Sequence, residues 1–294
     1  MEKELPEISF DKQISLNIEV MNFEQLFGKL AQIRAHDPFA PHKIEFYMIL
    51  ILTENSYSHF VDFNFYNLKE GSTLFVTKNQ VHHFTKELAH ANGYGVVFNH
   101  LFVNKHYFLT DNLRLKRLFN YHIENPIIHQ EEMGEDCLVD LIGNLFREYS
   151  SKNNFAKSEI LASLLRVLLL KAERAKELRA ITNINPQWLE TFSKFKDMLE
   201  SEYVNTRSSK FYASELFVSY KFLNEVVKKL TTKTVKAFID DFVIIEIKRY
   251  LISTSLTVNE ISYQTGFEEP ANMIKFFKKN TQTTPLKFRQ QQSF

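Results

Sequence analysis

Two stretches near the C-terminus share one pattern, and this duplication restricts the possible folds more than any other feature of the chain. The stretches are ASELFVSYKFLNEVVKKLTTKT (213–234) and NEISYQTGFEEPANMIKFFKKNTQTT (259–284). Short helices separated by tight corners are typical of helix-turn-helix motifs. The sequence therefore predicts two such motifs in an all-helical C-terminal part. The matching apolar positions are Leu216, Leu223 and Val227 in the first stretch and Ile261, Met273 and Phe277 in the second.

Local signals fix the ends of the predicted helices in the second stretch. Thr257 and Glu260 form a capping box at the start of the first helix, and Gly266 can adopt the left-handed conformation that ends it. Pro270 then begins the next helix without losing a needed N–H group. Ser219 is the corresponding N-cap in the first stretch. The core side of the second helix is expected to comprise Met273, Ile274, Phe276 and Phe277.

The outward faces of the second helices carry residue types that suit DNA. Asn can bond adenine through both its groups, and Lys can donate to guanine acceptors or to phosphates. Glu225 is less favourable, because a carboxylate repels phosphate. The segment TVKAFIDDFVIIEIKRYLIS (234–253) would hold the two helices about one DNA turn apart, roughly 34 Å, so that they read successive major grooves. The candidate DNA-binding residues are Tyr220, Lys221, Asn224 and Lys228 in the helix about Ser219–Leu230, and Ala271, Asn272, Lys275, Lys278 and Lys279 in the helix about Pro270–Lys279.

The region from about Trp188 to Gln290 resembles the DNA-binding domain of AraC/XylS-type bacterial transcription regulators. The stretch EISYQTGFEEPANMIKFFKKNTQTTPLKFR carries the resemblance, because it has the family's order of helix, G-F, recognition helix, F-K-K and T-P-x-x-[YF]-R. The resemblance implies base contacts by Lys221, Asn224, Asn272 and Lys275. The family usually has Gly after each recognition helix, whereas this chain has Thr232 and Gln282, which predicts a conformational cost if φ is positive there.

The first part of the chain, from Ile8 to about Phe108, reads as mostly β structure. Short runs rich in β-branched and aromatic residues recur between polar corners, as in an antiparallel sandwich or small barrel. The segment VDFNFYNL (61–68) alternates as a single strand that would bury Val61, Phe63 and Phe65. The runs HKIEFYMILILTE and GSTLFVTKNQVHHF are similar to the cupin-type sensor domain of the same family.

This resemblance implies an apolar pocket for a small-molecule effector, with Phe46, Tyr47, His82 and Phe84 as candidate binding residues. His82 and His83 could equally be core or surface residues. A metal site is not expected, since His42 and His82 are isolated along the sequence and no H-x-H motif is present. No cofactor is expected either.

Between Glu131 and Leu178 the apolar residues recur at helical spacing. They predict two amphipathic helices, the first with Met133 and Cys137 on its apolar face, the second with the run LASLLRVLLL (161–170). This run could cover the β part or pair with a second copy of the chain, and the sequence does not distinguish the two. The predicted fold class is α+β, with a cupin-like sensor domain at 1–125, a helical dimerisation or linker region at 126–182, and a double helix-turn-helix domain at 183–294.

Charge and composition agree with a DNA-binding regulator. Residues 1–180 contain 20 Lys and Arg against 23 Asp and Glu, a net charge of −3, whereas residues 181–294 contain 16 against 12, a net charge of +4. The expected partners are double-stranded promoter DNA, a small-molecule effector, a second copy in a homodimer, and RNA polymerase if the protein is an activator. A membrane is not expected, and the predicted location is the bacterial cytoplasm.

Three other functions are less consistent with the sequence. A cupin-fold enzyme with an accessory helical domain would need a metal constellation or an activated nucleophile. A DNA-alkylation repair protein would need several reactive cysteines, and Cys137 is the single cysteine. A sequence-independent architectural binder would need a larger basic excess.

Overall fold

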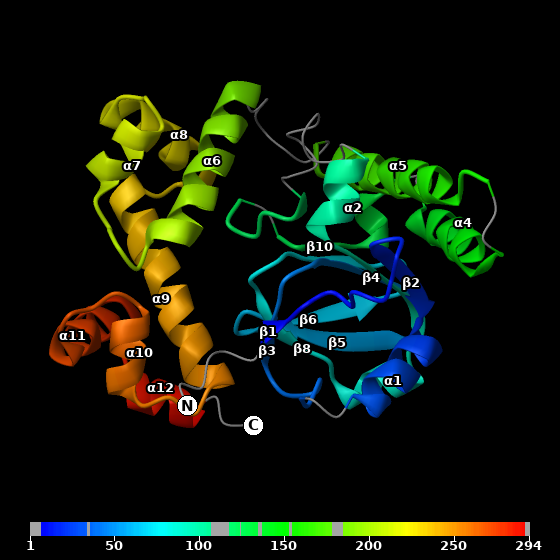
Figure 1. The fold of residues 1–294 in the computed structure, drawn as a ribbon, viewed down its shortest axis with the longest axis horizontal. Coiled ribbons are helices and arrows are strands. Elements are labelled where there is room, and N and C mark those ends of the chain that lie inside the picture. Colours follow the sequence, from blue (N-terminus) through cyan, green and yellow to red (C-terminus); the bar gives the residue numbers. More distant parts are fainter. Residues whose placement is uncertain are drawn as a thin grey trace. The chain divides into compact units, whose positions relative to one another are not determined.

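The structure, a computed structural model, describes residues 7–33, 36–106, 118–123, 125–134, 137–152, 155–177 and 185–291. The chain forms two compact units: residues 7–183, here called the β unit, and residues from 184 onward, here called the helical unit (Figure 1). The predicted α+β class, with a β-sheet part followed by an all-α part, is confirmed. The boundary expected between residues 182 and 183 lies outside the described residues.

Two five-stranded sheets form the framework of the β unit. One has the order β1 (Glu7–Ile8), β3 (His42–Ile44), β8 (Val81–His83), β5 (Ser56–Val61), β6 (Asn64–Lys69). The other has the order β10 (Ile127–Ile128), β7 (Thr73–Val76), β4 (Tyr47–Glu54), β9 (Asn92–Phe98), β2 (Ile18–Asn22). Neighbouring strands pair antiparallel except β1 and β3, which are parallel.

Strand β4 is apolar on both faces because both faces are buried. Ile49 and Ile51 pack into a cluster that includes residues of the helices α4 (Leu138–Ser150) and α5 (Lys157–Glu177). Met48 and Leu50 point the other way, into a cluster with the opposite sheet and helix α1 (Phe23–Gln32). Side chains alternate between the faces of a strand, so each β4 residue belongs to one of two separate cores.

The segment 61–68 is a hairpin and not the single strand that its alternation suggested. Asp62 and Phe63 form the turn between β5 and β6, with φ values of 41° and 73°. The carboxylate of Asp62 accepts hydrogen bonds from the Gln80 side chain at 2.8 Å and from the Val81 backbone N–H at 3.2 Å. These contacts with the neighbouring strand fix the turn, and they leave Phe65 half exposed on β6.

In the described ranges of the β unit, the helices are α1, the short α2 (His100–Lys105), α4 and α5, with 3-10 turns at Lys86–His90 and Gln130–Glu132. Helix α4 begins later than expected: Cys137 is its N-cap, and the buried Met133 precedes it. Leu161 and Leu165 of α5 are buried in the same core as α4, so this face of LASLLRVLLL is internal. The other face exposes Ile160, Val167 and Leu170.

Seven helices form the described part of the helical unit. In chain order they are α6 (Pro186–Glu202), α7 (Ser209–Glu215), α8 (Tyr220–Thr231), α9 (Val235–Ser253), α10 (Val258–Gln264), α11 (Pro270–Thr281) and α12 (Pro285–Gln291). The long helix α9 runs through the unit, with α7 and α8 toward one end and α10, α11 and α12 toward the other (Figure 1). Among the helices in the described ranges, none combines the length and apolar character needed to cross a membrane.

Candidate nucleic-acid interface

The second helix-turn-helix motif, α10 and α11, forms where the local signals predicted it. The hydroxyl of Thr257 accepts from the Glu260 N–H at 3.2 Å, while the Glu260 carboxylate accepts from the Thr257 N–H at 2.6 Å. Gly266 has a φ of +77°, and a Cβ atom built there would stand 2.1 Å from the Val204 carbonyl oxygen. Glycine is therefore required both for the left-handed turn and for the close approach of the backbone from the end of α6.

Two fully buried side chains anchor helix α11, and most of its other residues are exposed. Met273 and Phe277 are fully buried. Ile274 and Phe276, also expected on the core side, belong to it only in part: Ile274 is 36% exposed and Phe276 is half-buried against Phe267. Spacing alone could not separate them, because they lie on the edges of the apolar stripe. The candidate residues Ala271, Asn272, Lys275, Lys278 and Lys279 are all exposed.

The first motif, α7 and α8, has the same construction. Ser219 caps α8 by accepting from the Phe222 N–H at 3.1 Å, and Leu223, Val226 and Val227 form the buried side. Three of its four candidate residues, Tyr220, Lys221 and Lys228, are exposed, and so is Glu225.

Asn224 differs from the other candidates of α8. It is half-buried, and its side-chain oxygen accepts from the Val235 N–H at 3.1 Å at the start of α9. Its amide oxygen is thus used inside the helical unit. A bidentate contact with adenine would require this hydrogen bond to break.

Both recognition helices end in the left-handed conformation on a residue other than glycine. Thr232 has a φ of +62° and Gln282 a φ of +59°, and each donates its N–H to the carbonyl of the residue four positions earlier, Lys228 and Lys278 respectively. The cost expected for a positive φ at these two positions is therefore present.

Two arginines support the second motif in ways that the sequence patterns did not indicate. Arg207 donates to the Thr265 carbonyl at 2.7 Å, and its guanidinium lies 3.7 Å from the centre of the Phe267 ring. Arg289 donates to the Leu251 carbonyl of α9 at 2.9 Å. Two residues of the T-P-x-x-[YF]-R signature thus anchor α12: Arg289 joins it to α9, and Phe288 packs edge-on against the Phe277 ring of α11.

The exposed lysines of α11 have no acidic partner among the described residues. Some other lysines of the helical unit are paired, as Lys233 is with Asp241 and Lys236 with Asp240. No ion pair involves Lys275, Lys278 or Lys279 in the part of the chain that the structure describes. Helix α11 therefore presents unneutralised positive charge together with an exposed asparagine.

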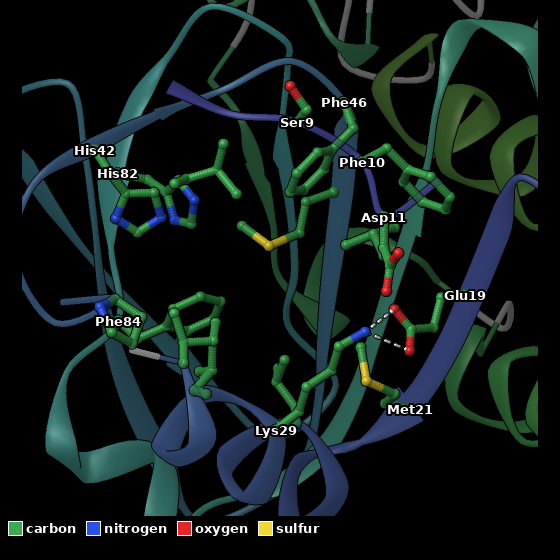
Figure 2. Close-up of a pocket in the computed structure, with 18 of the residues that line it drawn as sticks. Ser9, Phe10, Asp11, Glu19, Met21, Lys29, His42, Phe46, His82 and Phe84 are labelled. Atoms are coloured by element: carbon green, nitrogen blue, oxygen red, sulfur yellow. Dashed lines mark hydrogen bonds and ion pairs between the residues drawn. The ribbon is translucent and has the colours of Figure 1, made fainter. Parts of the chain in front are cut away.

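A separate cavity of about 530 Å³ lies inside the β unit (Figure 2). Of the candidate effector residues, Phe46, His82 and Phe84 line it, but Tyr47 does not. Tyr47 is on the opposite face of the sheet, where its ring stacks on Phe98 at 5.3 Å. The sequence could not assign this side, because both faces of β4 are buried.

The histidines around this cavity are not isolated in space. His42 pairs with His82 across β3 and β8, with ring centroids 4.5 Å apart, and His82 Nδ1 lies 3.1 Å from His59 Nε2. Burial lowers the pKa of His42 to about 4 and keeps the pKa of His59 and of His82 well below the usual value. Among the residues with described positions, no three His, Cys, Asp or Glu side chains are grouped to hold a metal ion.

Comparisons with known proteins give matches to one family model and to several solved structures. Residues 212–291 match the family model described as "Helix-turn-helix domain". Similar solved structures include the C-terminal domain of the response regulator yesN from Fusobacterium nucleatum, at 24% identity over 34% of this chain and 98% of that chain, with a TM-score of 0.32. ToxT from Vibrio cholerae is similar at 13% identity over 94% of this chain and 98% of that chain, with a TM-score of 0.47. The DNA-binding domain of AdpA, solved with a target DNA, is similar at 14% identity over 34% of this chain and 89% of that chain, with a TM-score of 0.32. A comparison with curated protein sequences gives no match.

The fold and the matched domain define a DNA-binding protein with two helix-turn-helix motifs. The matched residues 212–291 fall in the region whose sequence motifs resemble the DNA-binding domain of AraC/XylS-type transcriptional regulators, so the resemblance is confirmed for this helix-turn-helix domain.

Proposed function

We propose that the chain reads promoter DNA by inserting α8 and α11 into successive major grooves. The observation that carries this proposal is the division of α11 into a buried anchor, Met273 and Phe277, and an exposed face with unpaired lysines. Asn272 and Lys275 are at the start of that face, where a recognition helix contacts base edges. Lys278 and Lys279 follow toward its end, where they would neutralise phosphates.

The first motif contributes less to base reading in this proposal. Lys221 and Tyr220 are the exposed groups near the start of α8, whereas Asn224 retains only its amide N–H₂ group for DNA. Lys228 is placed like the phosphate-binding lysines of α11. Specificity then rests mainly on α11.

Substituting two lysines of the same helix tests this assignment. Lys275→Ala should cost about 1–3 kcal/mol on the cognate site and relax preference at one base pair. Lys279→Ala should weaken all sequences alike. One lost phosphate contact also makes the fall in affinity between 50 and 200 mM salt about 3.5-fold smaller than in the wild type.

Binding titrations on cognate and scrambled duplexes at several salt concentrations measure both effects. Lys194→Ala is the matched control, because Lys194 is exposed on α6 and paired with Glu190 outside both motifs. Identical behaviour of Lys275→Ala and Lys279→Ala would contradict the division into base-reading and phosphate-binding lysines.

We further propose that the cavity of the β unit holds a small-molecule effector. Its volume is in the range of small-molecule sites, and its walls are mostly apolar with a few polar groups. The neutral dye Nile red should bind saturably to the wild type. Val97→Trp, which fills the cavity from β9, should abolish this binding without changing affinity for DNA.

The exposed stripe Ile160, Val167 and Leu170 of α5 supports a homodimer. Val167→Asp should yield a monomer by light scattering, since it places a charge on the stripe and leaves the internal core intact. Leu165→Asp is not a suitable probe of the interface, because Leu165 is fully buried inside the β unit. An unchanged mass for Val167→Asp would exclude this stripe as the interface.

A further inference from the structure

The lining of the β-unit cavity is rich in carboxylates, and its one ammonium group is already occupied. Among the described residues, the charged side chains of the lining are Glu7, Asp11, Glu19 and Lys29. The Lys29 ammonium lies 2.7 and 2.6 Å from the two carboxylate oxygens of Glu19. An anionic ligand that sought Lys29 would have to displace Glu19 first.

The carboxylates of Glu7 and Asp11 are held by fewer contacts than that of Glu19. Glu7 is paired with Lys43 at 2.8 Å, but the side chain of Glu7 is 40% exposed. Asp11 is exposed, and among the described residues its Oδ1 accepts from the Gln13 N–H alone, at 2.9 Å. Among the described residues, Glu7 and Glu19 each pair with a lysine and Asp11 pairs with none, so the lining carries one uncompensated negative charge.

The histidines of the lining add no positive charge at neutral pH. Burial lowers the pKa of His36, lowers that of His42 to about 4 and keeps that of His82 well below the usual value. Their rings are therefore neutral hydrogen-bonding groups. His42 Nδ1 donates to the Ala40 carbonyl at 2.9 Å, which leaves Nε2 as an acceptor.

The polar groups lie at two separate ends of the cavity. In Figure 2, Asp11, Glu19 and Lys29 gather on one side and the rings of His42 and His82 on the other. The rest of the lining is mostly apolar and includes Leu30 and Leu50. This arrangement fits an elongated ligand with an apolar body and a polar head beside the carboxylates.

We propose that the ligand of this cavity is an amphipathic amine, and that the cavity discriminates against carboxylates and other anions of the same shape. The ammonium head would lie beside Asp11 and share Glu19 with Lys29. This inference rests on the proposed role of the cavity as the effector site and adds the chemical class of the effector.

Three ten-carbon ligands that differ only in their heads test the proposal: decylamine, decanol and decanoate. Each is titrated against Nile red bound to the full-length protein at pH 7, below its critical micelle concentration. Reversing the head charge beside one carboxylate replaces an attraction by a repulsion, so decylamine should displace the dye about 30-fold more tightly than decanoate. Decanol should be intermediate.

Glu19→Gln provides the internal test, because it frees the Lys29 ammonium without changing the size of the side chain. Decanoate should gain about 10-fold in affinity in this variant, while decylamine loses affinity. Glu70→Gln is the matched control, since Glu70 is exposed and does not line the cavity. Thermal unfolding of both variants checks that the β unit remains folded.

The outcomes separate this proposal from the one on which it rests. Tighter binding of decanoate than of decylamine by the wild type would overturn the charge preference and leave the effector site standing. Failure of all three ligands to displace the dye, or unchanged dye binding in Val97→Trp, would overturn the effector site and the amine proposal together.

Discussion

Gly266→Ala is the substitution whose effect follows most directly from the geometry of the second motif. An alanine there must adopt a φ of +77°, which costs about 1–2 kcal/mol for a residue with a Cβ atom. Its Cβ would also stand 2.1 Å from the Val204 carbonyl oxygen, a backbone atom that cannot rotate away. Relieving this overlap costs about 1–3 kcal/mol more. The helical unit should therefore lose about 2–5 kcal/mol of unfolding free energy.

Trp188 makes the measurement specific to this unit, because it is the single tryptophan of the chain and lies half-buried on α6. Urea unfolding followed by its fluorescence should show a markedly lower midpoint for Gly266→Ala. Gly143→Ala is the control: Gly143 is inside α4 of the β unit, and nothing lies within 4 Å of its added Cβ. A helical Gly→Ala change there should stabilise the β unit by about 0.5–1 kcal/mol and leave the Trp188 transition unmoved.

An unfolding free energy of Gly266→Ala within about 0.5 kcal/mol of the wild-type value would refute the reasoning. Such a result would mean that the loop at Val204 moves without cost, so that the turn between α10 and α11 does not depend on this contact. The DNA affinity of the variant, measured under conditions where the unit is still folded, gives a second reading. It should fall, because the turn sets the direction of α11.

Three further effects follow from the structure. Glu225→Ala should raise DNA affinity about 2- to 5-fold, most at low salt, since an exposed carboxylate leaves the recognition face of α8; equal affinities in a binding titration would place Glu225 away from phosphate. Gln282→Gly should stabilise the helical unit by about 0.5–1 kcal/mol in the Trp188 assay, because glycine removes the cost of a φ of +59°, and a loss of stability would contradict this account. The β unit should lose stability as the pH falls from about 6.5 toward 4, because His42, His59 and His82 bind protons in the unfolded chain but stay neutral in the folded one. The free energy of unfolding should fall by up to about 1.4 kcal/mol per pH unit for each histidine. Urea unfolding followed by far-UV circular dichroism at pH 7 and pH 5 measures this loss. Equal free energies of unfolding at the two pH values would show that the three histidines can be protonated in the folded β unit.

The parts of the site that the sequence could predict depend on neighbours along the chain. The capping box of Thr257 and Glu260, the cap at Ser219 and the left-handed Gly266 each involve residues a few positions apart. Helix geometry alone then decides which side chains face outward. For this reason the exposed face of α11 was predictable.

The parts that could not be predicted depend on contacts between distant residues. Arg207 is 58 positions from Thr265, and no local pattern links them. Asn224 has the residue type and position of a base-reading side chain, but a backbone N–H of α9 takes its oxygen. Asp62 and Phe63 form a turn without glycine because Gln80 on another segment holds the carboxylate.

The two faces of β4 show a different limit. Tyr47 and Phe46 are adjacent in a run that is apolar throughout, and alternation assigns them to opposite sides without saying which side faces the cavity. His42 and His82 were far apart in the sequence, and only the register of β3 and β8 makes them neighbours. Pairing between strands, rather than composition, determines such a cluster.

Helix α9 buries side chains on most of its circumference, from Val235 and Phe238 to Ile247 and Leu251, and even its Glu246 and Arg249 are almost fully covered. Such a helix needs neighbouring helices on most of its sides, so it cannot form the outer surface of a smaller protein. A fragment that keeps only one of the two helix-turn-helix motifs would expose half of α9 to water. Such a fragment should aggregate rather than fold into a smaller DNA-binding protein. Redesign of sequence preference is correspondingly safest on the outer sides of α8 and α11, where side chains can be exchanged without touching the common interior.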